Sequence, residues 1–181
     1  EKPREKTLEK KTLSGEVSWS LSSQEDANPE YASTKSNLES VIKRCHQILY
    51  SASSTVGSKA QNDIMRLLCL KLLSSQFADK SSGIWAKCDG VKAKYNMSDT
   101  KLEQYKNYCI HFKSLASEEN ITNVWKQLVT KFLMPLFPSI YFEEDATFNT
   151  PDVNAIKDLI LAIDELNVDE KFIDSFSTTC G

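Results

Sequence analysis

Apolar residues recur along most of this chain at the spacing of a helix. From Leu38 to Leu49 they fall three or four residues apart, which places them on one face of a helix. The same spacing recurs over residues 102–115, 121–132 and 153–166. The pattern therefore predicts amphipathic helices that each lay one face on a shared core.

Polar residues and prolines indicate where these helices begin. Ser36 and Glu39 form a capping-box pattern ahead of the first helix. Asn120 is a favourable N-cap for a later one. Pro151, directly after Thr150, stands where proline is favoured as the first helical residue. We therefore expect helices to start near residues 36, 121 and 151.

One segment, NDIMRLLCLKLLSSQF at Asn62–Phe77, has a different pattern. Its apolar side chains cover most of the helical circle and leave only a narrow polar strip. A helix of this kind is expected at the centre of a bundle. It still carries Arg66 and Lys71, which either lay their stems on apolar surface with the charge in water or pair with carboxylates.

The segment that follows, residues 79–100, reads as a connection. Gly83 and Gly90 are turn signals, and Trp85 and Tyr95 are expected to anchor the connection to the core. A solvated loop is one interpretation of its lysines, and a loop that contacts phosphates is the other.

These elements together predict an all-α fold, an orthogonal bundle of five or six helices with a buried central helix. Residues 1–33 are poor in large apolar side chains and are expected to form a flexible polar tail or linker. Residues 34–181 are expected to form the bundle, with residues 169–181 as a short last helix.

Composition narrows the possible functions. The net charge is −3, so the chain does not bind nucleic acid through an overall excess of positive charge. Its 5 cysteines are odd in number and form no CxxC pair, which is typical of a reduced, intracellular and cytoplasmic protein. No apolar run approaches the roughly 20 residues of a membrane span, so no membrane partner is expected.

Catalytic and metal-binding patterns are missing from the sequence. His46 and His111 are its 2 histidines, and their spacing from Cys45 and Cys109 does not match the pairs of structural zinc sites. There is no nucleophile elbow and no Walker loop. The sequence therefore predicts no cofactor or catalytic residue in this segment and favours a binding or assembly domain, although an enzyme site assembled from scattered residues stays open.

The segment Leu67–Ser74 carries a family resemblance. It resembles a helix in the N-terminal helical domain of type I restriction-modification methyltransferase subunits and related N6-adenine DNA methylases. DVNAIKDLILAIDELN resembles a later helix of that family, and DEKFIDSFSTTCG is similar to its lead-in to the catalytic domain. The resemblance covers residues 36–181. WKQLVTKFLMPLFPSIYF departs from the bacterial pattern and looks more like divergent methylases such as those of large DNA viruses.

The resemblance implies that this chain is the non-catalytic part of an S-adenosylmethionine-dependent enzyme. The family's Gly-rich cofactor loop and its Pro-Pro motif are both missing, since the chain has no Gly-x-Gly and no Pro-Pro pair. S-adenosylmethionine is therefore expected in the catalytic domain of the parent protein. The implied partners are double-stranded DNA, that catalytic domain and a specificity subunit.

A domain that helps to hold DNA during base flipping would contact backbone phosphates through lysines or arginines. Lys92 and Lys94 belong to the densest run of lysines without acidic neighbours in the sequence, and Lys101 and Lys106 follow on the next helix. We take these four lysines as candidate contacts to the DNA backbone. The alternative is a stand-alone helical adaptor that buries an apolar stripe against a partner protein.

Overall fold

The computed structural model describes residues 12–13, 16–17 and 29–168 of the 181-residue chain. The described part is almost entirely helical, which confirms the predicted all-α class. Two short antiparallel strands, β1 (Thr12–Leu13) and β2 (Glu16–Val17), precede the helices. The predicted last helix at residues 169–181 lies outside the described residues, as does most of the predicted tail.

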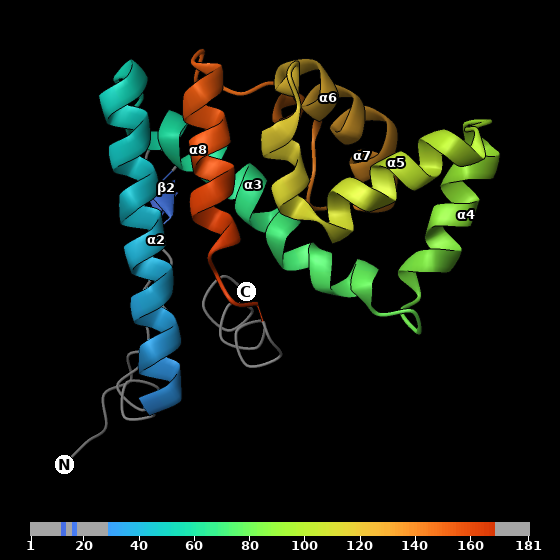
Figure 1. Ribbon diagram of the computed structural model, residues 1–181, viewed down its shortest axis with the longest axis horizontal. Coiled ribbons are helices and arrows are strands. Elements are labelled where there is room, and N and C mark those ends of the chain that lie inside the picture. Colours follow the sequence, from blue (N-terminus) through green and yellow to red (C-terminus); the bar gives the residue numbers. More distant parts are fainter. Residues whose placement is uncertain (1–11, 14–15, 18–28, 169–181) are drawn as a thin grey trace.

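The longer helices are α2 (Pro29–Ser53), α3 (Gly57–Ala78), α4 (Ile84–Lys94), α5 (Asp99–Ile110), α6 (Ile121–Leu128) and α8 (Val153–Asp164). The shorter helical elements are the 3₁₀ turns η1 (Phe112–Ser117) and η3 (Glu143–Ala146), the π-helical turn η2 (Val129–Leu133), and α7 (Met134–Leu136). Figure 1 shows α2 and α8 side by side at one end and α4 and α5 at the other. Helix α3 runs between the two ends and packs against α2, α4, α5 and α8.

Helix α3 contains the segment that the sequence marks as apolar on most faces. Ten of its residues are buried: Ala60, Gln61, Asp63, Ile64, Arg66, Leu67, Leu68, Leu70, Leu73 and Phe77. The helix begins at Gly57, whose φ of +63° lies in the left-handed region that glycine adopts without strain. Gly57 therefore turns the chain out of residues 54–56 and into the helix.

Helix α4 corrects the prediction that residues 79–100 form a connection. Ile84, Cys88 and Val91 are buried at helical spacing, so they form a core-facing stripe despite the neighbouring glycines. Trp85 contacts the ring of Phe77 edge-on, with the ring centroids 6.4 Å apart, as expected of an anchor. The other expected anchor, Tyr95, is 51% exposed, so that prediction is wrong.

Two predicted helix starts are also wrong. Helix α2 begins at Pro29, ahead of the capping-box pattern at Ser36. Helix α8 begins at Val153 because the side chain of Asp152 caps it, accepting hydrogen bonds from the backbone N–H groups of Asn154 (2.9 Å) and Ala155 (3.2 Å). Pro151 therefore lies outside the helix.

The predicted start after Asn120 is confirmed. The Asn120 side chain accepts a hydrogen bond from the backbone N–H of Asn123 at 3.3 Å, as an N-cap does. The α6 segment continues through η2, where the wider turn precedes Pro135, a residue that has no N–H to give to the helix. Phe132 in η2 packs on Phe77 with the ring centroids 6.0 Å apart, so this turn belongs to the core beside α3.

Candidate functional site

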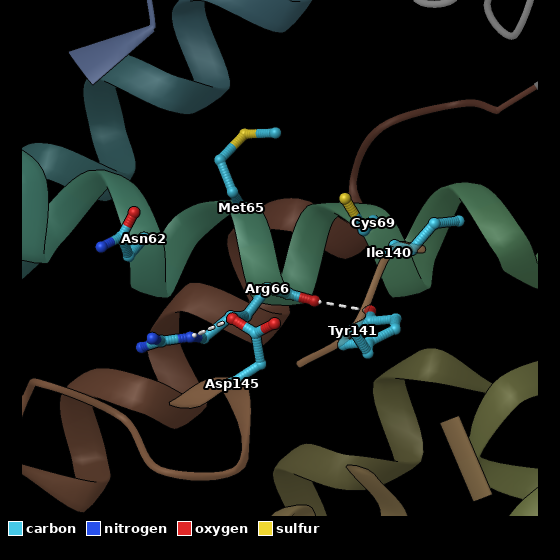
Figure 2. A pocket seen from close by; sticks show the side chains of 7 residues that line it. All are labelled: Asn62, Met65, Arg66, Cys69, Ile140, Tyr141 and Asp145. Carbon is cyan, nitrogen blue, oxygen red and sulfur yellow. Dashed lines mark hydrogen bonds and ion pairs between the residues drawn. The ribbon is translucent and has the colours of Figure 1, made fainter. Parts of the chain in front are cut away.

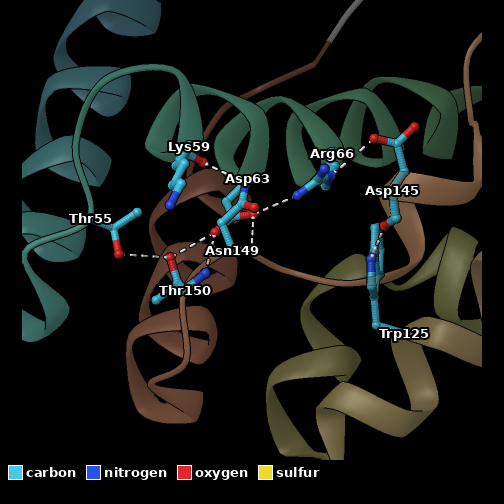
Figure 3. A network of polar contacts seen from close by, with 8 residues as sticks. All are labelled: Thr55, Lys59, Asp63, Arg66, Trp125, Asp145, Asn149 and Thr150. Atoms are coloured by element: carbon cyan, nitrogen blue, oxygen red, sulfur yellow. Dashed lines mark hydrogen bonds and ion pairs between the residues drawn. The ribbon is translucent and has the colours of Figure 1, made fainter.

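A buried carboxylate on α3 is the centre of the largest polar network in the described part of the chain (Figure 3). Asp63 is 0% exposed and accepts hydrogen bonds from the backbone N–H groups of Asn149 (2.9 Å) and Thr150 (2.8 Å). The Thr150 hydroxyl donates a third bond at 2.7 Å. Asp63 therefore fixes the segment before α8 against α3.

Arg66 extends the network in the other direction. Its Nη1 contacts Asp63 Oδ1 at 2.7 Å, and its Nε donates to Asp145 Oδ1 in η3 at 3.0 Å. The carbonyl of Asp145 accepts a hydrogen bond from the indole N–H of Trp125 at 2.8 Å. Lys71 likewise contacts Asp164 of α8 at 3.1 Å. Of the two alternatives that the sequence left open for Arg66 and Lys71, pairing with carboxylates is the correct one.

A cavity of about 100 Å³ adjoins Arg66 (Figure 2). Its walls are Asn62, Met65, Arg66, Cys69, Ile140, Tyr141 and Asp145. This volume is below the roughly 300 Å³ at which small-molecule sites begin. The hydroxyl of Tyr141 is committed to the Arg66 carbonyl at 2.9 Å, and burial raises the pKa of the Cys69 thiol to about 11, so Cys69 is protonated and a weak nucleophile at neutral pH. The cavity is best explained as part of the structural network.

The other described cysteines have the same character. Burial raises the pKa of Cys45 to about 12 and that of Cys88 to about 11, and it raises the pKa of Cys109 well above the ordinary thiol value. His46 contacts the Gln61 side chain at 3.3 Å. Within the described residues no three histidine, cysteine or acidic side chains come together as metal ligands.

The four candidate DNA-contacting lysines lie at the α4–α5 end. Lys92 and Lys94 are in the last turn of α4, while Lys101 and Lys106 are on α5. Lys92 forms an ion pair with Asp99, which lowers the pKa of Asp99 and raises that of Lys92 through a hydrogen bond and the charge interaction. The expectation that this run lacks acidic partners is therefore wrong for Lys92.

Lys106 has contacts within the fold as well. Its Nζ lies 3.3 Å from Glu103 Oε1 and 4.6 Å from the centre of the Trp85 ring, and its side chain is only 13% exposed. Lys94 and Lys101 are exposed. The Lys94 Nζ lies 5.4 Å from the ring of Tyr95, and that of Lys101 lies 3.4 Å from Gln104 Oε1. The structure thus leaves Lys94 and Lys101 more available to a ligand than Lys92 and Lys106.

Sequence reasoning missed Lys131 in η2, which lines the same surface hollow as Lys101. The apolar spacing over residues 121–132 leaves Lys131 on the outer face of that helix, and no other feature of the sequence points to it. Asp63 was also missed as a functional or structural centre, because its partners Asn149 and Thr150 are distant in the sequence.

Comparison of the chain with protein-family models, curated proteins and solved structures finds no match. Among the described helices, none combines the length and the apolar character needed to cross a membrane.

Proposed function

We propose that this chain is the non-catalytic N-terminal helical domain of an N6-adenine DNA methyltransferase of a restriction-modification-type system. In this proposal the α4–α5 end holds double-stranded DNA by its phosphates, and the rest of the domain, an orthogonal bundle around α3, assembles with the catalytic domain or a specificity subunit. S-adenosylmethionine would be bound by that catalytic domain. The resemblance of Leu67–Ser74 to the family supports the assignment.

The observation that carries the DNA-binding role is the meeting of lysines from two helices. Lys92 and Lys94 end α4, and Lys101 lies in the first turn of α5. Asp99 partly offsets their charge through its pair with Lys92. The remaining positive charge sits on a domain of net charge −3, so we expect weak binding that falls steeply with salt.

The test is titration of the chain into fluorescently labelled duplex DNA, read by anisotropy at low and moderate salt. We expect the double substitution Lys92→Glu and Lys94→Glu to weaken binding strongly at low salt and to reduce the salt slope of the remaining binding by about two. The matched control is Lys43→Glu with Lys113→Glu, which changes the charge equally at exposed positions on α2 and η1. Equal losses in both double variants, or no binding by the natural chain at low salt, would remove the DNA-holding role.

A second candidate function, a protein-interaction module, is favoured by two exposed apolar side chains. Ile140 is 41% exposed and Phe142 is 49% exposed, and the loop that carries them is fixed by a bond from the Phe142 backbone N–H to Asp145 Oδ2 at 2.8 Å. The test is pull-down of partner proteins from cell extract by the immobilised chain. Substitution of both residues by serine is expected to abolish capture of any partner that contacts this face.

A further inference from the structure

Helix α4 lies at the outer end of the bundle and places a small share of its residues in the core (Figure 1). Three of its eleven residues, Ile84, Cys88 and Val91, are buried, whereas six of the twelve residues of α8 are buried. Burial of apolar surface is the main force that holds a helix in a bundle. Helix α4 is therefore held less firmly than α8.

The sequence of α4 also gives this helix little stability of its own. Gly90 lies in its interior, where glycine costs more conformational entropy than any other residue. A Cβ atom added at Gly90 would meet nothing within 4 Å beyond the neighbouring backbone, so packing does not require a glycine there. The N-cap residue is Gly83, which has no side chain to cap the helix, while α5, α6 and α8 each have a side-chain cap. Ser82 partly compensates, since its hydroxyl accepts a bond from the N–H of Ile84 at 3.3 Å.

A few side-chain contacts attach α4 to the bundle besides its three buried residues. Trp85 packs edge-on against Phe77, and the Nζ of Lys106 on α5 lies 4.6 Å from the centre of the Trp85 ring. Lys92 pairs with Asp99, but both side chains are exposed. Such a pair adds little to the stability of α4, because water and salt weaken it. The attachment of α4 therefore depends mainly on Trp85 and the buried stripe.

Detachment of α4 amounts to local unfolding of residues 84–94. A helix of eleven residues does not persist in water by itself, since isolated helices shorter than about 12–15 residues are marginal. The contacts of α3 with α2, α5 and α8 do not involve α4, so they remain when α4 leaves. Local openings of this kind cost less free energy than global unfolding.

We propose that α4 switches between a docked helix and a locally unfolded segment while the rest of the bundle stays folded. In the docked form its last turn holds Lys92 and Lys94 beside the start of α5, which carries Lys101. In the unfolded form these lysines are no longer held together. Duplex DNA that contacts all three lysines therefore stabilises the docked form, a consequence that rests on the proposed DNA-holding function.

The experiment is alkylation of the full, folded chain with N-ethylmaleimide, followed by mass spectrometry of each cysteine-containing peptide. Cys88 of α4 and Cys45 of α2 are both 0% exposed, so each thiol reacts only when its surroundings open. Each rate is divided by the rate of the same thiol in the urea-unfolded chain, which removes differences in intrinsic reactivity. We expect Cys88 to react more than about tenfold faster than Cys45 after this correction.

Two substitutions separate local opening from global unfolding. Gly90→Ala is expected to slow the reaction of Cys88 about fivefold, because alanine favours the helical form of α4. Tyr141→Phe is the control, since it weakens the bundle away from α4 by removing the bond to the Arg66 carbonyl. It is expected to leave the rate of Cys88 unchanged.

Three results would overturn the switch. The first is a corrected rate of Cys88 no faster than that of Cys45. The second is a rate of Cys88 that Gly90→Ala does not lower. The third is acceleration of both thiols by Tyr141→Phe, because Cys88 would then react through global unfolding.

Duplex DNA tests the link between the switch and binding. At low salt, a saturating concentration of duplex is expected to slow the reaction of Cys88 severalfold, and the effect should disappear at the salt concentration at which the duplex dissociates. Binding of the duplex without this slowing would overturn the link. If no duplex binds but Cys88 still reacts as expected in the natural chain and both variants, the switch is established and the DNA-holding role alone fails.

Discussion

The polar network of Asp63, Arg66 and Asp145, which joins α3 to η3, and the α4–α5 end both contain paired opposite charges. The two pairs of charges differ in burial. Asp63 and Arg66 are almost fully enclosed, and neighbouring backbone and side-chain groups satisfy the carboxylate. Lys92 and Asp99 also form a pair, yet their side chains are 37% and 84% exposed. A buried pair holds elements together because its loss leaves an uncompensated charge. An exposed pair is easily replaced by water or by a ligand.

The largest expected effect comes from breaking the buried pair. Asp63→Ala leaves Arg66 without its closest carboxylate and removes the acceptor for three hydrogen bonds from Asn149 and Thr150. We expect the free energy of unfolding to fall by about 3–5 kcal/mol, measured by urea denaturation followed by circular dichroism. Asp158→Ala, an exposed carboxylate on α8, is the control and should cost little. A loss below about 1 kcal/mol for Asp63→Ala would contradict the structural role of the network.

A smaller effect is expected at the edge of the same network. Tyr141→Phe keeps the ring and removes only the hydroxyl that donates to the Arg66 carbonyl at 2.9 Å. We expect a loss of about 1 kcal/mol in the free energy of unfolding, the usual net value of one hydrogen bond. Tyr50→Phe removes an exposed hydroxyl on α2 and should leave stability unchanged. Equal effects of the two substitutions would mean that the hydrogen bond of Tyr141 does not contribute to the free energy of unfolding.

The smallest effect is expected at the exposed pair. Lys92 lowers the pKa of Asp99, so any stabilisation from the pair is present above the ordinary aspartate pKa near 3.9 and is lost as the pH falls. We expect Lys92→Ala to raise the pKa of Asp99 towards its ordinary value, measured by NMR titration of the carboxyl carbon. Stability at pH 7 should not change measurably. An unchanged Asp99 pKa would show that the pair does not persist in solution.

The sequence was informative wherever an element has a wide apolar face. The stripes of α5, α6 and α8 and the nearly all-round apolar character of α3 were predicted from spacing, since core packing requires those positions. Helix α4 was missed because its stripe is short and glycines with lysines interrupt it. The pairing of Arg66 was one of two expectations, but its partner Asp145 lies 79 residues away, a contact that no local pattern encodes.

The candidate site was less predictable than the fold. Lysines are visible in the sequence, whereas the contacts that occupy Lys92 and Lys106 depend on how α4 and α5 pack together. The same limit applies to Lys131, which becomes a neighbour of Lys101 only when η2 reaches the α4–α5 connection. Spacing along a helix predicts which face is buried, but it does not predict which distant surface residues meet.

Asp63 contacts residues that are distant in the sequence, and this has a consequence for how the protein folds during synthesis. Its partner Thr150 lies 87 residues further along the chain. A ribosome that adds about 5–20 residues per second needs about 4–17 s between the addition of Asp63 and the addition of Thr150. From the addition of Ala78 onwards α3 is complete, but it still lacks the segment that covers its carboxylate and the α8 surface that packs against it. A nascent chain in this state exposes an unusually apolar helix, which makes α3 a segment for a chaperone to protect until Thr150 has been added.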